Sequence, residues 1–314
     1  MTPNARARAL VALCALAAGA FAGCGLGAGE ERDGAGVELR VTRDFGQREL
    51  ASHRVTKVRE GDTVMRLLRS REQDVEARYG GKFVQSIGSL SGGGATGSED
   101  WFYFVNGIEA GKGAADFELS PGDVVQWDFR DYSGAMRVPA IVGAWPEPFV
   151  HGNDGKRLPV RIECEDDGGK ACKLARAALD EAGVEVTGAA LGAPAGDEVL
   201  RVVVARWERA REVRAASVLA DEPARSGVFA RFRDDRLELL APDGRPAETA
   251  PPGTGLVAAT TQPGQGVVWV LTGLTNAAVE HAAAALDERS LRNRFAVAAG
   301  PAAVRALPLR ETRR

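Results

Sequence analysis

The chain has 314 residues, of which 45% are hydrophobic and 26% are charged, and this length is enough for two domain cores. Its formal net charge is −3, and its arginines are scattered without forming a basic block. Nucleic-acid-binding domains usually concentrate positive charge on one face. We therefore expect two folded domains and no nucleic-acid partner.

The first 23 residues predict export. Two arginines and no acidic residue lie in residues 1–8, and an apolar run over 9–23 follows, which is the order of a signal peptide. The run is shorter than the ~20 residues that a membrane-spanning helix needs. Phe21-Ala22-Gly23-Cys24 resembles the bacterial lipobox, although that motif usually has Leu where this chain has Phe21. The resemblance implies cleavage after residue 23, lipid attachment at Cys24 and a place on the outer face of the bacterial cytoplasmic membrane. An ordinary secretory signal is the alternative.

Residues 37–132 predict a small domain of strands with one helix. Alternating or β-prone residues indicate strands over 37–42, 53–58, 83–87, 101–105 and 124–129. Asp62 or Thr63 is a suitable N-cap for a helix that begins at residue 64. In the strand 101–105, Trp101 and Tyr103 share one face, while the opposite face is also apolar. One helix covers one face only, so the other must meet the second domain, a partner or a ligand.

These motifs carry a resemblance. The sequence reads GDTV at 61–64, FVQSIG at 83–88, WFYFVNG at 101–107, GAAD at 113–116 and LSPGDVVQW at 119–127. In order and spacing it resembles the bacterial domain family related to the C-terminal β-domain of transcobalamin. The resemblance covers about residues 37–132 and implies a β-grasp-like fold, a small mixed sheet with one helix.

In the vitamin carriers, this domain closes over cobalamin together with an α/α barrel. Residues after 132 show no repeated helical hairpins, so the resemblance implies a separate exported barrel protein and an uptake transporter as partners. It also implies a cobalamin-like or other small molecule as the ligand, and we expect no other cofactor. Together with the loop 88–100, the candidate ligand or partner face comprises Ser86, Gly88, Trp101, Tyr103, Asn106 and Trp127.

The second half predicts an α/β domain of no family that we recognise, so the expected fold class of the whole chain is α+β. Strands are indicated over 158–164, 198–206, 255–261, 266–272 and 294–299, and a hairpin over 228–240. Helices are indicated over 170–182, 208–220 and 275–289. We expect a signal peptide at 1–23, a lipidated N-terminus and spacer at 24–36, and domains at 37–132 and 158–300. A connector containing prolines at 133–157 and a C-terminal tail at 301–314 complete the layout.

The cysteines predict a disulfide. If Cys24 is lipidated, Cys164 and Cys172 remain as a pair in an oxidising compartment. The acidic residues beside Cys164 leave a metal site as the less favoured alternative, because no histidine or close Cys-x-x-Cys spacing accompanies them. The Gly-rich loop 88–97 lacks the Gly-Lys-Ser/Thr sequence that ends a phosphate-binding loop. The turn at 272–275 could cap a helix or bind an anion, and the helix cap is the favoured interpretation.

Catalytic machinery is not indicated. None of the three histidines, His53, His151 and His281, lies in a recognised nucleophile motif. The sequence favours a surface-tethered ligand-binding or accessory lipoprotein that is not an enzyme and has no metal site. A structural or interaction protein of the cell envelope is the alternative, and an undetected hydrolase is the third possibility.

Overall fold

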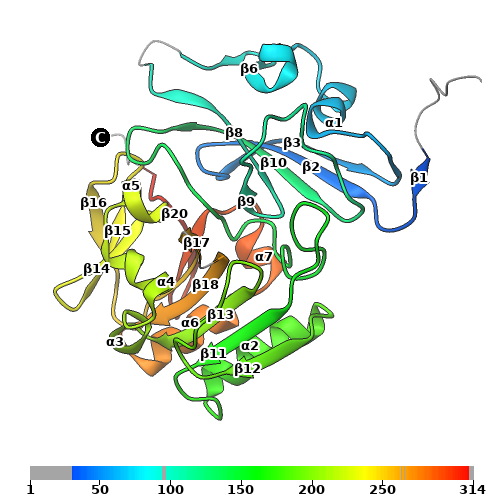
Figure 1. Cartoon of the computed structure of the whole chain (residues 1–314). Coiled ribbons are helices and arrows are strands. Elements are labelled where there is room, and N and C mark those ends of the chain that lie inside the picture. The colour runs from blue at the N-terminus through cyan, green and yellow to red at the C-terminus, as the bar shows by residue number, and fades with distance from the viewer. Residues whose placement is uncertain (1–29, 94–96, 263, 265, 311–314) are drawn as a thin grey trace, which may run out of the picture.

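The computed structural model describes residues 30–310 apart from 94–96, 263 and 265. The signal peptide and Cys24 lie outside these residues, so export and lipid attachment stay predictions. Figure 1 shows two halves, each built around its own sheet. The described residues are rich in strand and mixed in class, as the α+β prediction has it. Among them, no helix has the length and apolar character needed to cross a membrane.

The N-terminal half contains a five-stranded mixed sheet in the order β3-β2-β10-β8-β9. Its strands are β2 (Val37–Arg43), β3 (Arg48–Val55), β8 (Glu99–Val105), β9 (Ile108–Glu109) and β10 (Val124–Asp131). β2 and β10 pair in parallel, and the other neighbours are antiparallel. The helix α1 (Val64–Arg71) begins where predicted, since Thr63 Oγ1 accepts a hydrogen bond from the Arg66 N–H at 3.3 Å. The described residues of this half thus form a mixed sheet with the helix α1 packed on it.

Two small sheets accompany this half. β1 (Glu31–Arg32) pairs with β4 (Val58–Arg59), so the first described strand lies close to the start of α1. β5 (Val75–Arg78), β6 (Phe83–Ile87) and β7 (Leu90–Ser91) form the other sheet, and a short 3₁₀ turn, η1 (Tyr79–Gly81), joins β5 to β6.

The C-terminal half contains a seven-stranded sheet in the order β12-β11-β13-β18-β17-β19-β20. Its first four strands run parallel, namely β12 (Val186–Ala189), β11 (Val160–Cys164), β13 (Leu200–Arg206) and β18 (Gly266–Gly273). The other three are antiparallel, namely β17 (Gly255–Gln262), β19 (Ala296–Ala299) and β20 (Val304–Leu307).

Both faces of this sheet are covered. Helices α2 (Lys170–Glu181) and α6 (Asn276–Ala284) pack on one face. The other face carries the short helices α3 (Trp207–Ala210), α4 (Arg214–Ser217), η2 (Val218–Ala220) and α5 (Pro223–Ser226), and the small sheet β14 (Ala230–Arg233), β15 (Arg236–Leu240) and β16 (Pro246–Thr249). Strands covered on both sides read as continuous apolar runs, which explains Val202-Val203-Val204.

Several predicted elements are wrong in extent. The helix expected over 208–220 is divided, because Val213 takes an extended conformation and buries its side chain in the core. The helix expected over 275–289 ends at residue 284, and extended Asp287 caps a new helix, α7 (Glu288–Leu291), by accepting from the Ser290 N–H at 2.8 Å. Residues 304–307, expected in a tail, form the edge strand β20. Tertiary packing overrides local preference at these places.

The two halves share a buried boundary. Phe104 of β8 and Phe295 lie with ring centroids 5.3 Å apart, in a cluster that includes Ile141 of the connector. Charged groups cross the same boundary, since Arg292 Nη2 donates to Glu38 Oε1 at 2.8 Å. The connector is therefore part of the joint between the halves and not a loose tether.

Candidate functional site

The carboxyl ends of the parallel strands open into a cavity. The chain leaves β11, forms α2, and returns as β12 on one side of β11, while β13 lies on the other side. In open sheets of this kind, ligands bind where the connections diverge in this way, outside the carboxyl ends of the strands. A cavity of about 450 Å³ lies at this point, which we call the switch-point crevice.

The crevice combines polar walls with a small apolar patch. Its apolar lining comes from Ala171, Val204, Ala205 and Val279, and its polar lining from Glu165, Asp166, Lys170, Arg206, Asn276 and Glu280. Two helices, α2 and α6, begin at its edge. Thus one hollow brings together residues that are more than a hundred positions apart in the sequence.

The two helix starts differ. In α6, Thr275 Oγ1 accepts a hydrogen bond from the Ala278 N–H at 3.2 Å, so the predicted cap at the turn 272–275 is confirmed. In α2, the N-cap position is Gly169, and no side chain of the described residues caps the helix. The N–H groups of a first helical turn have no partner within the helix. The start of α2 therefore presents donor groups and a partial positive charge to the crevice.

Each cation of the crevice is paired with a carboxylate. Lys170 Nζ lies 2.8 Å from Glu280 Oε2, and Arg206 Nη2 lies 2.5 Å from Glu165 Oε1. Burial raises the pKa of Glu165, but hydrogen bonds from the side chain and backbone of Arg206 outweigh it and hold this pKa below its usual value. The same carboxylate raises the pKa of the Arg206 guanidinium through hydrogen bonding and charge. Glu165 is therefore held as a carboxylate that can accept hydrogen bonds.

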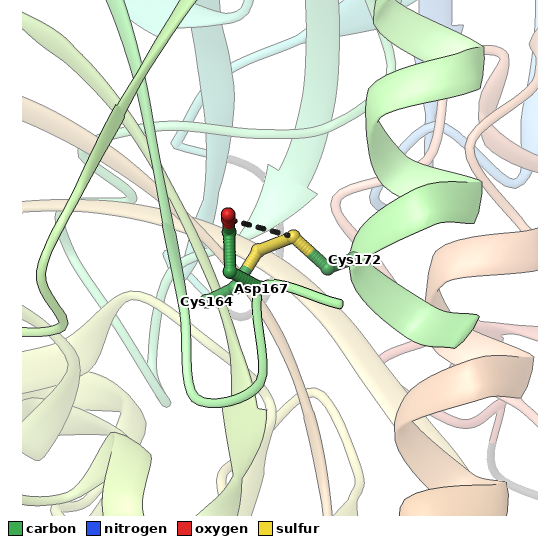
Figure 2. Close-up of side chains that lie close together, drawn as sticks. All are labelled: Cys164, Asp167 and Cys172. Carbon is green, nitrogen blue, oxygen red and sulfur yellow. Dashed lines mark hydrogen bonds between the residues drawn. A yellow bond between two sulfur atoms is a disulfide. The ribbon is translucent and has the colours of Figure 1, made fainter. Parts of the chain in front are cut away.

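A disulfide fixes the wall of the crevice. Cys164, the last residue of β11, is bonded to Cys172 in the first turn of α2, with 5.9 Å between their Cα atoms, so the predicted pairing is confirmed. Figure 2 shows Asp167 beside this bond, with its Oδ1 3.7 Å from Cys172 Sγ. The potential ligand atoms of these three residues lie within 4.8 Å of one another. In the oxidised form, both sulfurs are used by the disulfide, so neither is a thiolate that can bind a metal.

The face predicted from the aromatic residues is not a free surface. Trp101, Tyr103 and Trp127 are buried on the side of the sheet that packs against α1, and Tyr103 stacks on Trp127 with centroids 4.8 Å apart. The opposite face, with Phe104, meets the C-terminal half. The expectation that Trp101 and Tyr103 face a partner or ligand is therefore wrong, because the alternation assigned the residues to faces without showing which face α1 covers.

The other predicted face residues have separate places. Ser86 is buried, and Asn106 is fully buried with its Nδ2 donating to Asp123 Oδ1 at 2.8 Å, which fixes the turn between β8 and β9. Gly88 is exposed and borders a second hollow of about 320 Å³, whose edge Trp101 also reaches. The predicted set is therefore dispersed between the core, a turn and a small hollow.

The histidines lie outside the crevice lining. His53 Nε2 lies 2.7 Å from Glu72, His151 Nδ1 lies 2.5 Å from Glu147, and His281 Nδ1 lies 2.8 Å from the Gly253 carbonyl oxygen. Sequence reasoning missed the crevice itself, because its residues become neighbours only through the strand order. The single local signal was the pair of helix starts after β11 and β18.

Comparison with known proteins assigns no activity. Residues 61–131 match a family described as a domain of unknown function (DUF4430). A solved structure from Ruminococcus gnavus ATCC 29149, of a protein to which metal binding has been ascribed, is 15% identical, covers 31% of this chain and 97% of its own, and has a TM-score of 0.26. No curated protein matches this chain.

Proposed function

We propose that this chain is an exported lipoprotein, held at the outer face of the bacterial cytoplasmic membrane through Cys24, that binds a small polar molecule in the switch-point crevice. The observation that carries the proposal is the position of the crevice at the carboxyl ends of parallel strands, beside the uncapped start of α2. The signal peptide and the lipobox-like Cys24 support the location.

The charges of the crevice favour a zwitterionic or neutral ligand. Three carboxylates, those of Glu165, Asp166 and Glu280, face two cations, those of Lys170 and Arg206. A helix N-terminus adds roughly half a positive charge, which brings the site close to neutrality. A ligand carboxylate can accept hydrogen bonds from the start of α2 and Lys170, while a ligand ammonium or hydroxyl can donate to Glu280.

The size of the crevice bears on the uptake role. Its volume of about 450 Å³ lies in the lower part of the range of ~300–1,000 Å³ typical for small-molecule sites. The crevice therefore suits a ligand smaller than cobalamin. Uptake of a cobalamin-like molecule would instead use the N-terminal half together with a separate α/α-barrel protein. In either case, a lipid at Cys24 would keep the protein beside a transporter of the same membrane.

A ligand screen with matched variants tests the crevice. The mature chain is heated with free amino acids, betaines, simple sugars and cyanocobalamin, because a ligand that binds the folded state raises the unfolding temperature. We expect a free amino acid to do so, because its ammonium can donate to Glu280, which the quaternary nitrogen of a betaine cannot do. Lys170→Gln should reduce this shift, because its ammonium lines the crevice, whereas Lys173→Gln, exposed on the same helix but outside the lining, should leave it unchanged. Equal responses of the two variants, or no stabilising zwitterion, would contradict the proposal.

Lipid labelling tests the anchor. Cells that express the full chain incorporate labelled fatty acid, and Cys24→Ser should abolish the label because the thioether needs sulfur. Cys14→Ser removes the other cysteine of the signal segment and should leave the label intact. Full labelling of the Cys24→Ser protein would reject the lipoprotein assignment.

A further inference from the structure

A basic and aromatic surface lies on the N-terminal half. Helix α1 buries Val64, Met65, Leu67 and Leu68, while three of its four exposed residues are arginines. The β5–β6 hairpin beside it exposes Arg78, Tyr79 and Phe83. We call this set the basic–aromatic face, and it comprises Arg66, Arg69, Arg71, Arg78, Tyr79 and Phe83.

The hairpin turn displays its aromatic residues. Tyr79 has a left-handed backbone with a φ of 52°, an uncommon conformation for a bulky residue, and Gly80 and Gly81 continue in the left-handed region. Tyr79 is 78% exposed, and Phe83, which is 38% exposed, lies opposite Arg78 in the β5–β6 pairing. Backbone strain of this kind persists only where the surrounding structure enforces it. Two exposed aromatic rings thus lie at one end of the hairpin.

The charge of this region is opposite to that of the chain. Residues 64–83 contain five basic and three acidic side chains, whereas the chain as a whole has a net charge of −3. Within the described residues, none of the four arginines of the face forms an ion pair, although Arg66 donates a hydrogen bond to the Gly61 carbonyl oxygen. Their charges are therefore available to an anionic surface.

The face lies on the side of the molecule where the described chain begins. Figure 1 shows α1 and the β6 hairpin at the end of the N-terminal half that points away from the C-terminal half, with β1 at the outer edge of the same half. β1 pairs with β4, which ends at Arg59, shortly before α1 starts. The seven residues 24–30 can span at most about 25 Å. A lipid at Cys24 would therefore hold this end of the molecule close to the membrane.

We propose that the basic–aromatic face docks on the anionic phospholipid headgroups of the membrane that carries the lipid anchor. The arginines lie against headgroup phosphates, and Tyr79 and Phe83 enter the interface, where aromatic rings are favoured. The proposal rests on the location given by the proposed function, but not on acylation itself. Docking turns the C-terminal half, with the switch-point crevice, away from the bilayer.

Vesicle co-sedimentation tests the docking. The probe is the mature chain with Cys24→Ser, which carries no lipid, mixed with vesicles of equimolar phosphatidylglycerol and phosphatidylcholine, or of phosphatidylcholine alone. We expect binding to the anionic vesicles that weakens as salt is added, because surface charges are screened. Each arginine near an anionic surface contributes about fivefold to the affinity. Replacing Arg66, Arg69 and Arg71 with Gln should therefore lower the affinity for anionic vesicles on the order of a hundredfold.

A matched variant controls for net charge. The C-terminal half has three exposed arginines that form no ion pair among the described residues, namely Arg211, Arg214 and Arg289. Replacing all three with Gln should leave the binding to anionic vesicles unchanged. Tyr79→Ser should weaken the binding that persists at high salt. Circular dichroism checks that each variant is folded.

The outcomes separate the two proposals. The docking proposal would be overturned if both triple variants lost the same affinity for anionic vesicles. It would also be overturned if the chain bound neutral and anionic vesicles equally, or did not bind anionic vesicles at all. Vesicle binding that the face variant retains would also overturn it, because other residues would then carry the binding. If the Cys24→Ser protein still incorporates labelled fatty acid while the face binds anionic vesicles, the lipid anchor at Cys24 is rejected and the docking proposal stands.

Discussion

Trp101 decides whether the aromatic face of the N-terminal half is core or contact surface. The residue is 4% exposed, its ring centroid lies 5.2 Å from that of Phe129, and its Nε1 donates to the Leu90 carbonyl oxygen at 3.1 Å. Truncating a buried large aromatic residue typically costs ~3–5 kcal/mol. Trp101→Ala should therefore lower the free energy of unfolding by that amount, a large fraction of the ~5–15 kcal/mol of an ordinary domain.

The companion variant Trp101→Phe separates packing from hydrogen bonding. It keeps most of the ring contact with Phe129 but loses the bond to Leu90, so we expect a smaller loss of about 1–2 kcal/mol. Urea denaturation followed by circular dichroism measures both changes. A loss below about 1 kcal/mol for Trp101→Ala would refute the core assignment, since only an exposed ring can be removed at so small a cost.

Two further predictions concern the disulfide and the boundary between the halves. Because Cys164 and Cys172 are eight residues apart, loop-closure entropy predicts that their bond adds about 2.5 kcal/mol to the free energy of unfolding. The Cys164→Ser/Cys172→Ser double variant should therefore unfold at a lower urea concentration, and equal unfolding midpoints would contradict this. Burial raises the pKa of Glu38, but Arg40 and Arg292 outweigh it and lower this pKa from 4.5 to about 2. The unfolded state then binds more protons, so the stability from Glu38 is present above pH 4.5 and is lost as the pH falls toward 2. Glu38→Gln should destabilise the chain more at pH 6 than at pH 3, and an equal effect at both values would exclude this role.

Local signals in the sequence predicted much of the fold. Thr63 and the apolar spacing after it gave the start of α1, the alternation over 37–42 gave β2, and the even number of remaining cysteines gave the disulfide. Each depends on neighbours within a few residues, so the chemistry is visible in the sequence itself.

Features set by distant contacts were not predictable in this way. The alternation at Trp101 and Phe104 identifies two faces, but the choice between them depends on where α1 and the C-terminal half pack. The divided helix at Val213 and the strand β20 likewise depend on the sheet that they join. The switch-point crevice needs the strand order, because Glu165 and Glu280 meet only when β11 and β18 lie in one sheet.

The most direct test of the account is amide chemical-shift mapping of the mature chain with the zwitterion that stabilises it most. We predict the largest shifts at the start of α2, at Lys170 and Ala171, and at Asn276 across the crevice, with little change around Trp101. Shifts concentrated at the hollow beside Gly88 and Trp101, with α2 unaffected, would contradict the claim that the switch-point crevice is the binding site.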